Sequence, residues 1–97
     1  MRELMEMYFG QADQIMPGLQ KAVQTGDVGE VDHLAHKLAG SSLACGLSGI
    51  VPPLRRMEQG AKAGHLNGAA ELLAEAVTAL ELLRHAVQDY LRQLPGP

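Results

Sequence analysis

One histidine of this sequence, His36, has the environment of a side chain that does chemistry. At about 100° per residue, the apolar residues of its segment cluster about 160° to 220° away from it, on the opposite face of a helix. These residues are Val31, Leu34, Leu38 and Cys45. The imidazole of His36 is therefore predicted to meet water, where a neutral ring can act as a nucleophile.

Gly40 lies one helical turn after His36 and about 40° away from it around the helix. A glycine inside a helix costs roughly 0.5–1 kcal/mol relative to alanine, so its presence indicates a steric requirement. Without a side chain at this position, a large partner can approach the imidazole. Gly40 is therefore predicted to give such a partner steric access.

Two other kinds of chemistry are weaker interpretations of the same segment. His33 and His36 are spaced to share a metal ion with Asp32, but zinc sites generally need three or four converging protein ligands. Since no second ligand cluster follows, no metal site is predicted. The hydroxyls of Ser41 and Ser42 face the apolar side of the helix, so close helix packing is predicted for them in place of nucleophilic attack.

Composition places the chain among small helical domains. Its 97 residues suffice for one core, and its apolar residues are mostly Leu, Ala, Val and Met, with no Trp. A formal net charge of −3 without a Lys/Arg cluster argues against a nucleic-acid surface. A lone cysteine, Cys45, is typical of a reducing compartment.

Membrane insertion and export are not expected either. No apolar run approaches the roughly 18–20 residues of a membrane span, and Glu3 and Glu6 interrupt the amino-terminal segment where a signal peptide would be apolar. A cytoplasmic location is therefore expected. Whether the chain is a free protein or one domain of a larger receptor stays open.

Hydrophobic periodicity predicts four helices, at about residues 2–24, 28–44, 49–63 and 68–94 of a single domain, 1–97. Pro17 is expected to kink or split the first helix. The connections are only a few residues long, which makes consecutive helices antiparallel neighbours. The predicted fold is an all-α, antiparallel four-helix bundle.

Helix ends and buried stripes follow from the same pattern. Gly26 is expected to end the first helix in a left-handed conformation, whereas Asp27, Ser48 and Asn67 are expected to cap the next three. The predicted buried positions of the four helices are Leu4, Tyr8, Ala12, Ile15, Leu19 and Val23; Val28, Val31, Leu34 and Leu38; Leu54, Met57 and Ala61; and Leu73, Val77, Leu80, Leu83, Val87, Tyr90, Leu91 and Leu94.

The segment His36-Lys37-Leu38-Ala39-Gly40-Ser41-Ser42, followed by Gly46-Leu47 and the helix from Ile50 to Met57, resembles the histidine-containing phosphotransfer (HPt) domain of bacterial and fungal phosphorelays. The resemblance implies a cytoplasmic monomer, without turnover of its own, in which His36 accepts a phosphoryl group. The donors and acceptors would be aspartates of response-regulator receiver domains, with a sensor histidine kinase as a further partner. Such a domain needs no cofactor of its own, because the receiver carries the Mg²⁺.

The sequence departs from the family at one position. The family usually has a lysine three residues after the histidine, and Ala39 stands there. Lys37 and Lys62 are the expected replacements as phosphoryl-stabilising cations, Lys62 because it falls on a basic family position of the third helix. Glu58 falls on a polar family position one turn earlier and, as an anion, is excluded as a phosphoryl ligand. Asp32 and His33, beside His36, are expected to form part of the docking surface.

Two alternative functions remain open at this point. The chain could be the phosphorylatable domain of a chemotaxis-type histidine kinase, although those domains tend to read His-Ser-Ile-Lys-Gly-Gly. It could also be a degenerate bundle that docks receivers without accepting phosphate, an interpretation that Ala39 supports.

Overall fold

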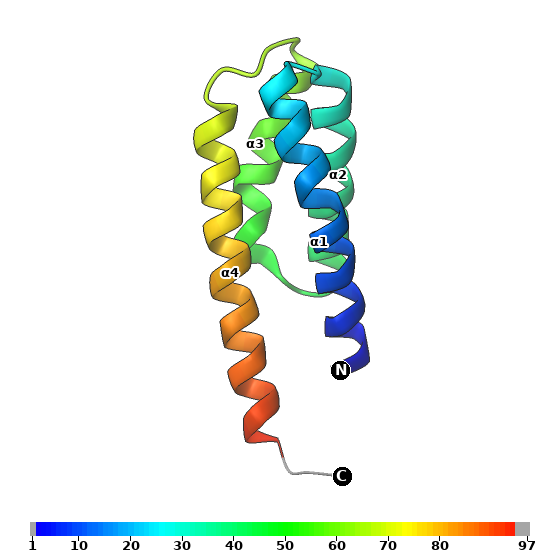
Figure 1. Cartoon of the computed structure of the whole chain (residues 1–97), viewed down its shortest axis with the longest axis vertical. Helices are drawn as coiled ribbons and strands as arrows, with labels where there is room; N and C mark the ends of the chain where they lie inside the picture. The colour runs from blue at the N-terminus through cyan, green and yellow to red at the C-terminus, as the bar shows by residue number, and fades with distance from the viewer. Residues whose placement is uncertain (1, 95–97) are drawn as a thin grey trace.

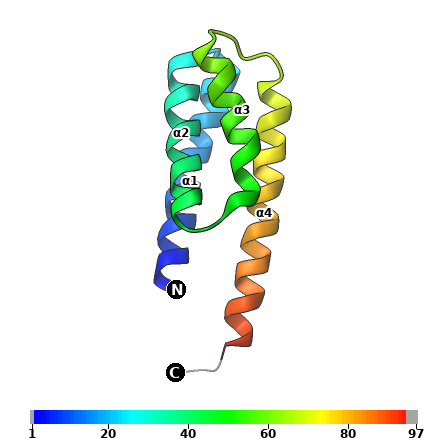
Figure 2. The ribbon, with the colours of Figure 1, turned by 180° about the vertical axis from the view of Figure 1, so that it is seen from behind.

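The computed structural model of the chain describes residues 2–94, which form an antiparallel helical bundle (Figure 1). The elements are α1 (Arg2–Thr25), α2 (Val28–Ala44), the short 3-10 turn η1 (Ser48–Ile50), α3 (Val51–Lys62) and α4 (Ala69–Gln93). Each α-helix packs against two others, in the cyclic order α1, α2, α3, α4. Figure 2 shows α3 lying between α2 and α4. The predicted four-helix bundle is confirmed, and the described residues contain no strand.

The first helix is continuous through Pro17, so of the two predicted outcomes at this residue a split is wrong. Proline lacks the N–H that would bond to the preceding turn, and its ring crowds that turn. The ring of Pro17 lies on the exposed side of α1, while Ile15, Met16 and Leu19 around it are buried. Burial of these side chains on both sides of the proline keeps α1 in one piece.

The caps at the α1–α2 connection agree with the sequence pattern. Gly26 has a φ of 73°, a left-handed conformation that glycine adopts without a steric cost. The Asp27 carboxylate accepts a hydrogen bond of 3.1 Å from the backbone N–H of Glu30, as expected of an N-cap. This tight connection sets α2 antiparallel to α1.

The predicted caps of α3 and α4 are wrong. Ser48 begins η1, and α3 starts after it at Val51 without a side-chain cap, because Pro52 and Pro53 occupy its first turn. Asn67 does not cap α4 either, since the N-cap position is Gly68 with a φ of 74°. The helix therefore begins one residue later than expected, after a left-handed glycine that has no side chain to cap it.

The core lies along the inner faces of all four helices, and most predicted core positions are buried or half-buried. Three predictions are wrong: Leu4, Tyr90 and Leu94 are 48%, 54% and 38% exposed. On α1 the buried positions near the start are Met5 and Phe9 instead of Leu4. As Figures 1 and 2 both show, the end of α4 extends beyond the neighbouring helices. No helix within residues 2–94 therefore faces the last part of its apolar stripe.

A buried chain of hydroxyl groups fastens α1 to α2. Ser42 Oγ donates to the backbone carbonyl of Leu38 at 2.7 Å, and Tyr8 Oη lies 2.7 Å from Ser42 Oγ. Because a serine hydroxyl has one proton, the Tyr8 hydroxyl is the donor in the second bond. Burial raises the pKa of Tyr8, an effect that the bond to Ser42 only partly offsets. The predicted packing role of Ser42 is confirmed.

Candidate functional site

His36 lies on the outer face of α2, where its side chain is 64% exposed. The residues that α2 buries on its other face include Val31, Ala35 and Leu38. The ring borders a shallow groove between α2 and α3, lined by Gly29, Asp32, His33, His36, Glu58 and Lys62. The predicted exposure of the imidazole is therefore confirmed, and its neighbours come from α3.

The nearest of these neighbours is Glu58 of α3. Its Oε2 atom lies 2.5 Å from Nδ1 of His36, and its side chain is only 7% exposed. Glu58 follows Leu54 and Met57 on a helix whose apolar face packs into the core. The carboxylate therefore reaches His36 from a largely buried position on α3 that lines the groove.

Glu58 is held in its charged form. Burial raises the pKa of its carboxyl, but hydrogen bonds with Arg55, His36 and Lys62 outweigh burial and bring the pKa below its ordinary value. An ionised carboxylate can only accept hydrogen bonds, so the short contact assigns the proton to Nδ1 of His36. The lone pair of the neutral ring then lies on Nε2, which has no hydrogen-bond partner among residues 2–94.

Two cations share this carboxylate. Arg55 Nη1 lies 2.9 Å from Glu58 Oε1, and Lys62 Nζ lies 3.4 Å from Glu58 Oε2. Arg55 Nη1 is also 3.4 Å from Nδ1 of His36. With Nδ1 protonated, both of these nitrogens are donors, so Glu58 is their common acceptor. The Arg55, Glu58, Lys62 and His36 side chains form one connected network, which we call the His36 network.

The structure brings several of the predicted site residues to one place. Asp32, His33 and Lys62 line the groove beside His36, as the prediction of a docking surface and a nearby cation requires. Gly40 is exposed, and a Cβ atom built on it would meet no atom within 4 Å. The space next to the imidazole is therefore open on that side.

Lys37 is not brought into this arrangement. It is exposed and forms no ion pair or hydrogen bond with the described part of the chain. Its direction, about 100° around the helix from His36, accounts for the separation. A role for Lys37 at the phosphoryl group stays a prediction.

Sequence reasoning missed Arg55 and the role of Glu58. The two residues and Lys62 stand at spacings of three and four, which place them on one face of α3. That spacing is a signal, but it says nothing about which helix the face meets. Glu58 was excluded as a phosphoryl ligand, and the structure gives it a different contact, with Nδ1, the ring nitrogen other than Nε2.

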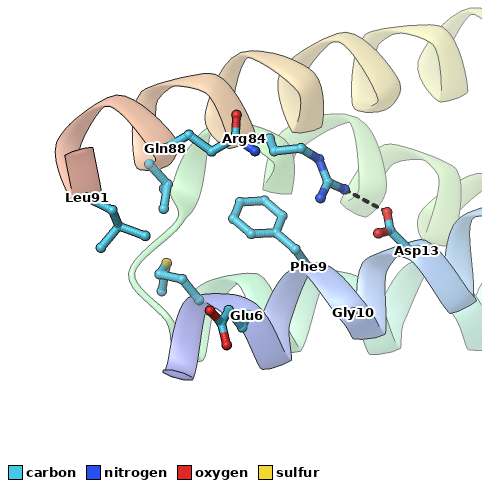
Figure 3. A pocket seen from close by; sticks show the side chains of 9 residues that line it. Glu6, Phe9, Gly10, Asp13, Arg84, Gln88 and Leu91 are labelled. Atoms are coloured by element: carbon cyan, nitrogen blue, oxygen red, sulfur yellow. Dashed lines mark hydrogen bonds and ion pairs between the residues drawn. The ribbon is translucent and has the colours of Figure 1, made fainter. Parts of the chain in front are cut away.

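A second hollow lies between α1 and α4 and shares no residue with the groove at His36. Figure 3 shows Arg84 of α4 extending toward Asp13 of α1, beside the ring of Phe9. The Arg84–Asp13 ion pair is 2.6 Å long, and the guanidinium carbon lies 4.6 Å from the centre of the Phe9 ring. This arrangement links α1 to α4 and is separate from the His36 network.

The His36 network has the parts of a nucleophile with an orienting partner. The carboxylate fixes the ring and its tautomer, as acidic partners of reactive histidines do, and Nε2 is left exposed for attack. No group of three or more His, Cys, Asp or Glu side chains within residues 2–94 is arranged to hold a metal ion. An exposed imidazole with an orienting carboxylate is suited to nucleophilic attack on an electrophile.

Comparison with known proteins adds one finding. The sequence model of the family described as Hpt domain matches residues 3–94, nearly the whole chain. No curated protein and no solved structure shows significant similarity to the chain. In the described region, none of the helices combines the length and apolar character that a bilayer crossing requires.

Proposed function

Because the chain belongs to the Hpt domain family, whose members carry phosphoryl groups in two-component signalling, we propose that it relays a phosphoryl group between receiver-domain aspartates through Nε2 of His36. The observation that carries this proposal is the contact between His36 and Glu58, which engages Nδ1 and leaves the exposed Nε2 as the nucleophile.

The proposed step needs no proton transfer. The Nε2 lone pair attacks the phosphorus of a receiver aspartyl phosphate, forming the N–P bond as the P–O bond to the aspartate breaks. The electron pair of that bond stays with the aspartate, which leaves as a carboxylate. The ring keeps its Nδ1 proton and acquires a positive charge, which the Glu58 carboxylate 2.5 Å away stabilises.

The same contact suits the reverse step. Phosphoryl transfer depends mainly on positioning and charge stabilisation, so the carrier only needs to hold a labile N–P bond in a fixed direction. When a second receiver presents a free aspartate, that carboxylate attacks the phosphorus and the electron pair of the N–P bond returns to Nε2. The divalent cation that assists both transfers is expected on the receiver.

The partner is expected to cover the groove and the open space at Gly40. Asp32 and His33 flank His36 there, and the surface carries both signs of charge through Asp32 and Lys62. A small, mixed surface of this kind suits a transient encounter between proteins. We expect the protein to act as a cytoplasmic monomer in this encounter, with a sensor histidine kinase at the start of the relay.

The test is phosphoryl transfer from a panel of phosphorylated receiver domains to the wild type and to His36→Gln, with His33→Gln as a matched exposed-histidine control. The proposal predicts acid-labile, alkali-stable label on the wild type and on His33→Gln, and none on His36→Gln. Transfer only from an ATP-dependent kinase domain would favour the chemotaxis-type function instead. Receiver binding that persists without any label would indicate a docking bundle.

A further inference from the structure

A phosphoryl group on Nε2 of His36 brings negative charge to the surface of α2, and the residues that offset it are not obvious from the helix itself. Ala39, three residues after His36, is fully buried and carries no charge. Lys37 lies away from the network. The cations that the structure places nearest to the ring come from α3, and they are Arg55 and Lys62.

Of these two, Arg55 is the one that reaches the imidazole. Its Nη1 atom lies 3.4 Å from Nδ1 of His36, whereas Lys62 approaches only the carboxylate of Glu58. The Arg55 side chain is 34% exposed and is anchored by the 2.9 Å bond to Glu58 Oε1. Its guanidinium therefore lies beside the imidazole and is already anchored before any phosphoryl group arrives.

Some hydrogen-bond donors of the Arg55 guanidinium are free to bind a ligand. A guanidinium has five N–H donors in a planar fork, and those on Nε and Nη2 have no acceptor among residues 2–94. Planar forks match the oxygens of phosphoryl groups, and such charge-assisted bonds are stronger than neutral ones. Arg55 can therefore keep one N–H on Glu58 while its other donors bind phosphoryl oxygens.

We propose that Arg55 is the phosphoryl-binding residue of this protein, holding the group on Nε2 of His36 from α3 while Glu58 holds Nδ1. The inference rests on the proposed function of His36 as a phosphoryl carrier. Each residue of the His36 network then has a separate role: Glu58 orients the ring, Arg55 binds the transferred group, and Lys62 adds positive charge beside the groove.

The experiment uses phosphoramidate, a small phosphoryl donor, so that no receiver surface enters the measurement. The wild type, Arg55→Gln, Arg55→Lys and Arg56→Gln are labelled, and the phosphohistidine is followed by ³¹P NMR across a pH titration. Arg56→Gln is the matched control, because Arg56 is the adjacent exposed arginine without an ion pair to residues 2–94 and its loss changes the net charge equally. Circular dichroism verifies that each variant is folded.

We expect Arg55→Gln to label about five- to twenty-fold more slowly than the wild type, the loss of one charge-assisted interaction. Its phosphoryl resonance should titrate at a higher pH, by up to about one unit, because a nearby cation favours the dianion. Arg55→Lys should recover part of both effects, and Arg56→Gln should match the wild type.

Two results would overturn the inference alone, provided that His36 of the wild type is labelled. One is an Arg55→Gln variant that equals Arg56→Gln in both rate and titration. The other is slower labelling with an unchanged phosphoryl titration, which would show that Arg55 acts only through Glu58. If His36 of the wild type took no label from phosphoramidate and none from any phosphorylated receiver either, the proposed function would fail, and this inference with it.

Discussion

The carboxylate of Glu58 on α3 lies 2.5 Å from Nδ1 of His36 on α2 and is almost fully buried, whereas the imidazole is mostly exposed. One partner of the pair is thus fixed in the protein and the other faces solvent. This asymmetry lets the protein present a ring of defined orientation and tautomer to a partner without enclosing it. Two measurable properties of the protein should follow from this pair, and two more from Gly40 and from the hydroxyl contact between α1 and α2.

Replacing Glu58 by Gln should slow phosphoryl transfer to His36. The amide oxygen can still accept the Nδ1 proton, but the negative charge that stabilises the phosphorylated ring is lost. We expect the single-turnover rate from a phosphorylated receiver to fall by about tenfold, which corresponds to about 1.4 kcal/mol. Glu75→Gln on the exposed face of α4 is the control. Equal rates for these two variants would contradict the assigned role.

The pH dependence of stability should report the same carboxylate. The pKa of Glu58 lies below its ordinary value of 4.5, because its hydrogen bonds outweigh its burial. Its ionisation therefore stabilises the fold fully above that ordinary value, and the contribution is lost as the pH falls through the lowered pKa. In denaturant titrations from pH 7 to pH 3, the free energy of unfolding should fall more for the wild type than for Glu58→Gln. Parallel pH profiles would mean that the pKa is not lowered.

Substitutions at Gly40 should affect the stability of the fold and the rate of phosphoryl transfer differently. A Cβ at this position meets no atom within 4 Å, so Gly40→Ala should raise the free energy of unfolding by roughly 0.5–1 kcal/mol through helix propensity. Gly40→Leu should fold as well but slow transfer from receivers, because its side chain fills the approach to His36. Labelling by phosphoramidate should change far less in Gly40→Leu. An unimpaired rate with receivers would show that the glycine is not needed for access.

The hydroxyl chain between α1 and α2 should show strong coupling. Ser42→Ala leaves the buried Tyr8 hydroxyl without its acceptor, a loss of about 1–3 kcal/mol in the free energy of unfolding. Adding Tyr8→Phe removes the unpaired hydroxyl, so the double variant should be more stable than the sum of the two single changes predicts. Denaturant unfolding of the four proteins in this cycle measures the coupling. Additive losses would mean that the two hydroxyls do not depend on each other.

The fold could be predicted from the sequence because its signals are local. The apolar stripes around His36, the left-handed Gly26 and the Asp27 cap each depend on residues a few positions apart. The failures arise where the outcome depends on distant partners. Tyr90 belongs to the apolar stripe of α4, but its side chain is 54% exposed, because burial also requires a facing helix and none of the other described helices covers it.

In the candidate site, too, features that depend on one helix could be predicted and contacts between helices could not. The exposure of His36 follows from the phase of one helix, so it could be predicted. The contact of His36 with Glu58 depends on how α2 and α3 pack, which puts residues 22 positions apart within hydrogen-bond distance. Arg55 could not be assigned to the site from its spacing alone, because the same face of α3 could have pointed at solvent.

The proposed function depends on one bond, between phosphorus and Nε2 of His36. The most direct measurement is heteronuclear NMR of the phosphorylated protein with ¹⁵N-labelled histidine, which identifies both the residue and the ring nitrogen bonded to phosphorus. The contact between His36 and Glu58 predicts a phosphoryl group on Nε2 of His36, with the Nδ1 proton retained in its bond to Glu58. Phosphorus on Nδ1 of His36, or on His33, His65 or His85, would contradict it.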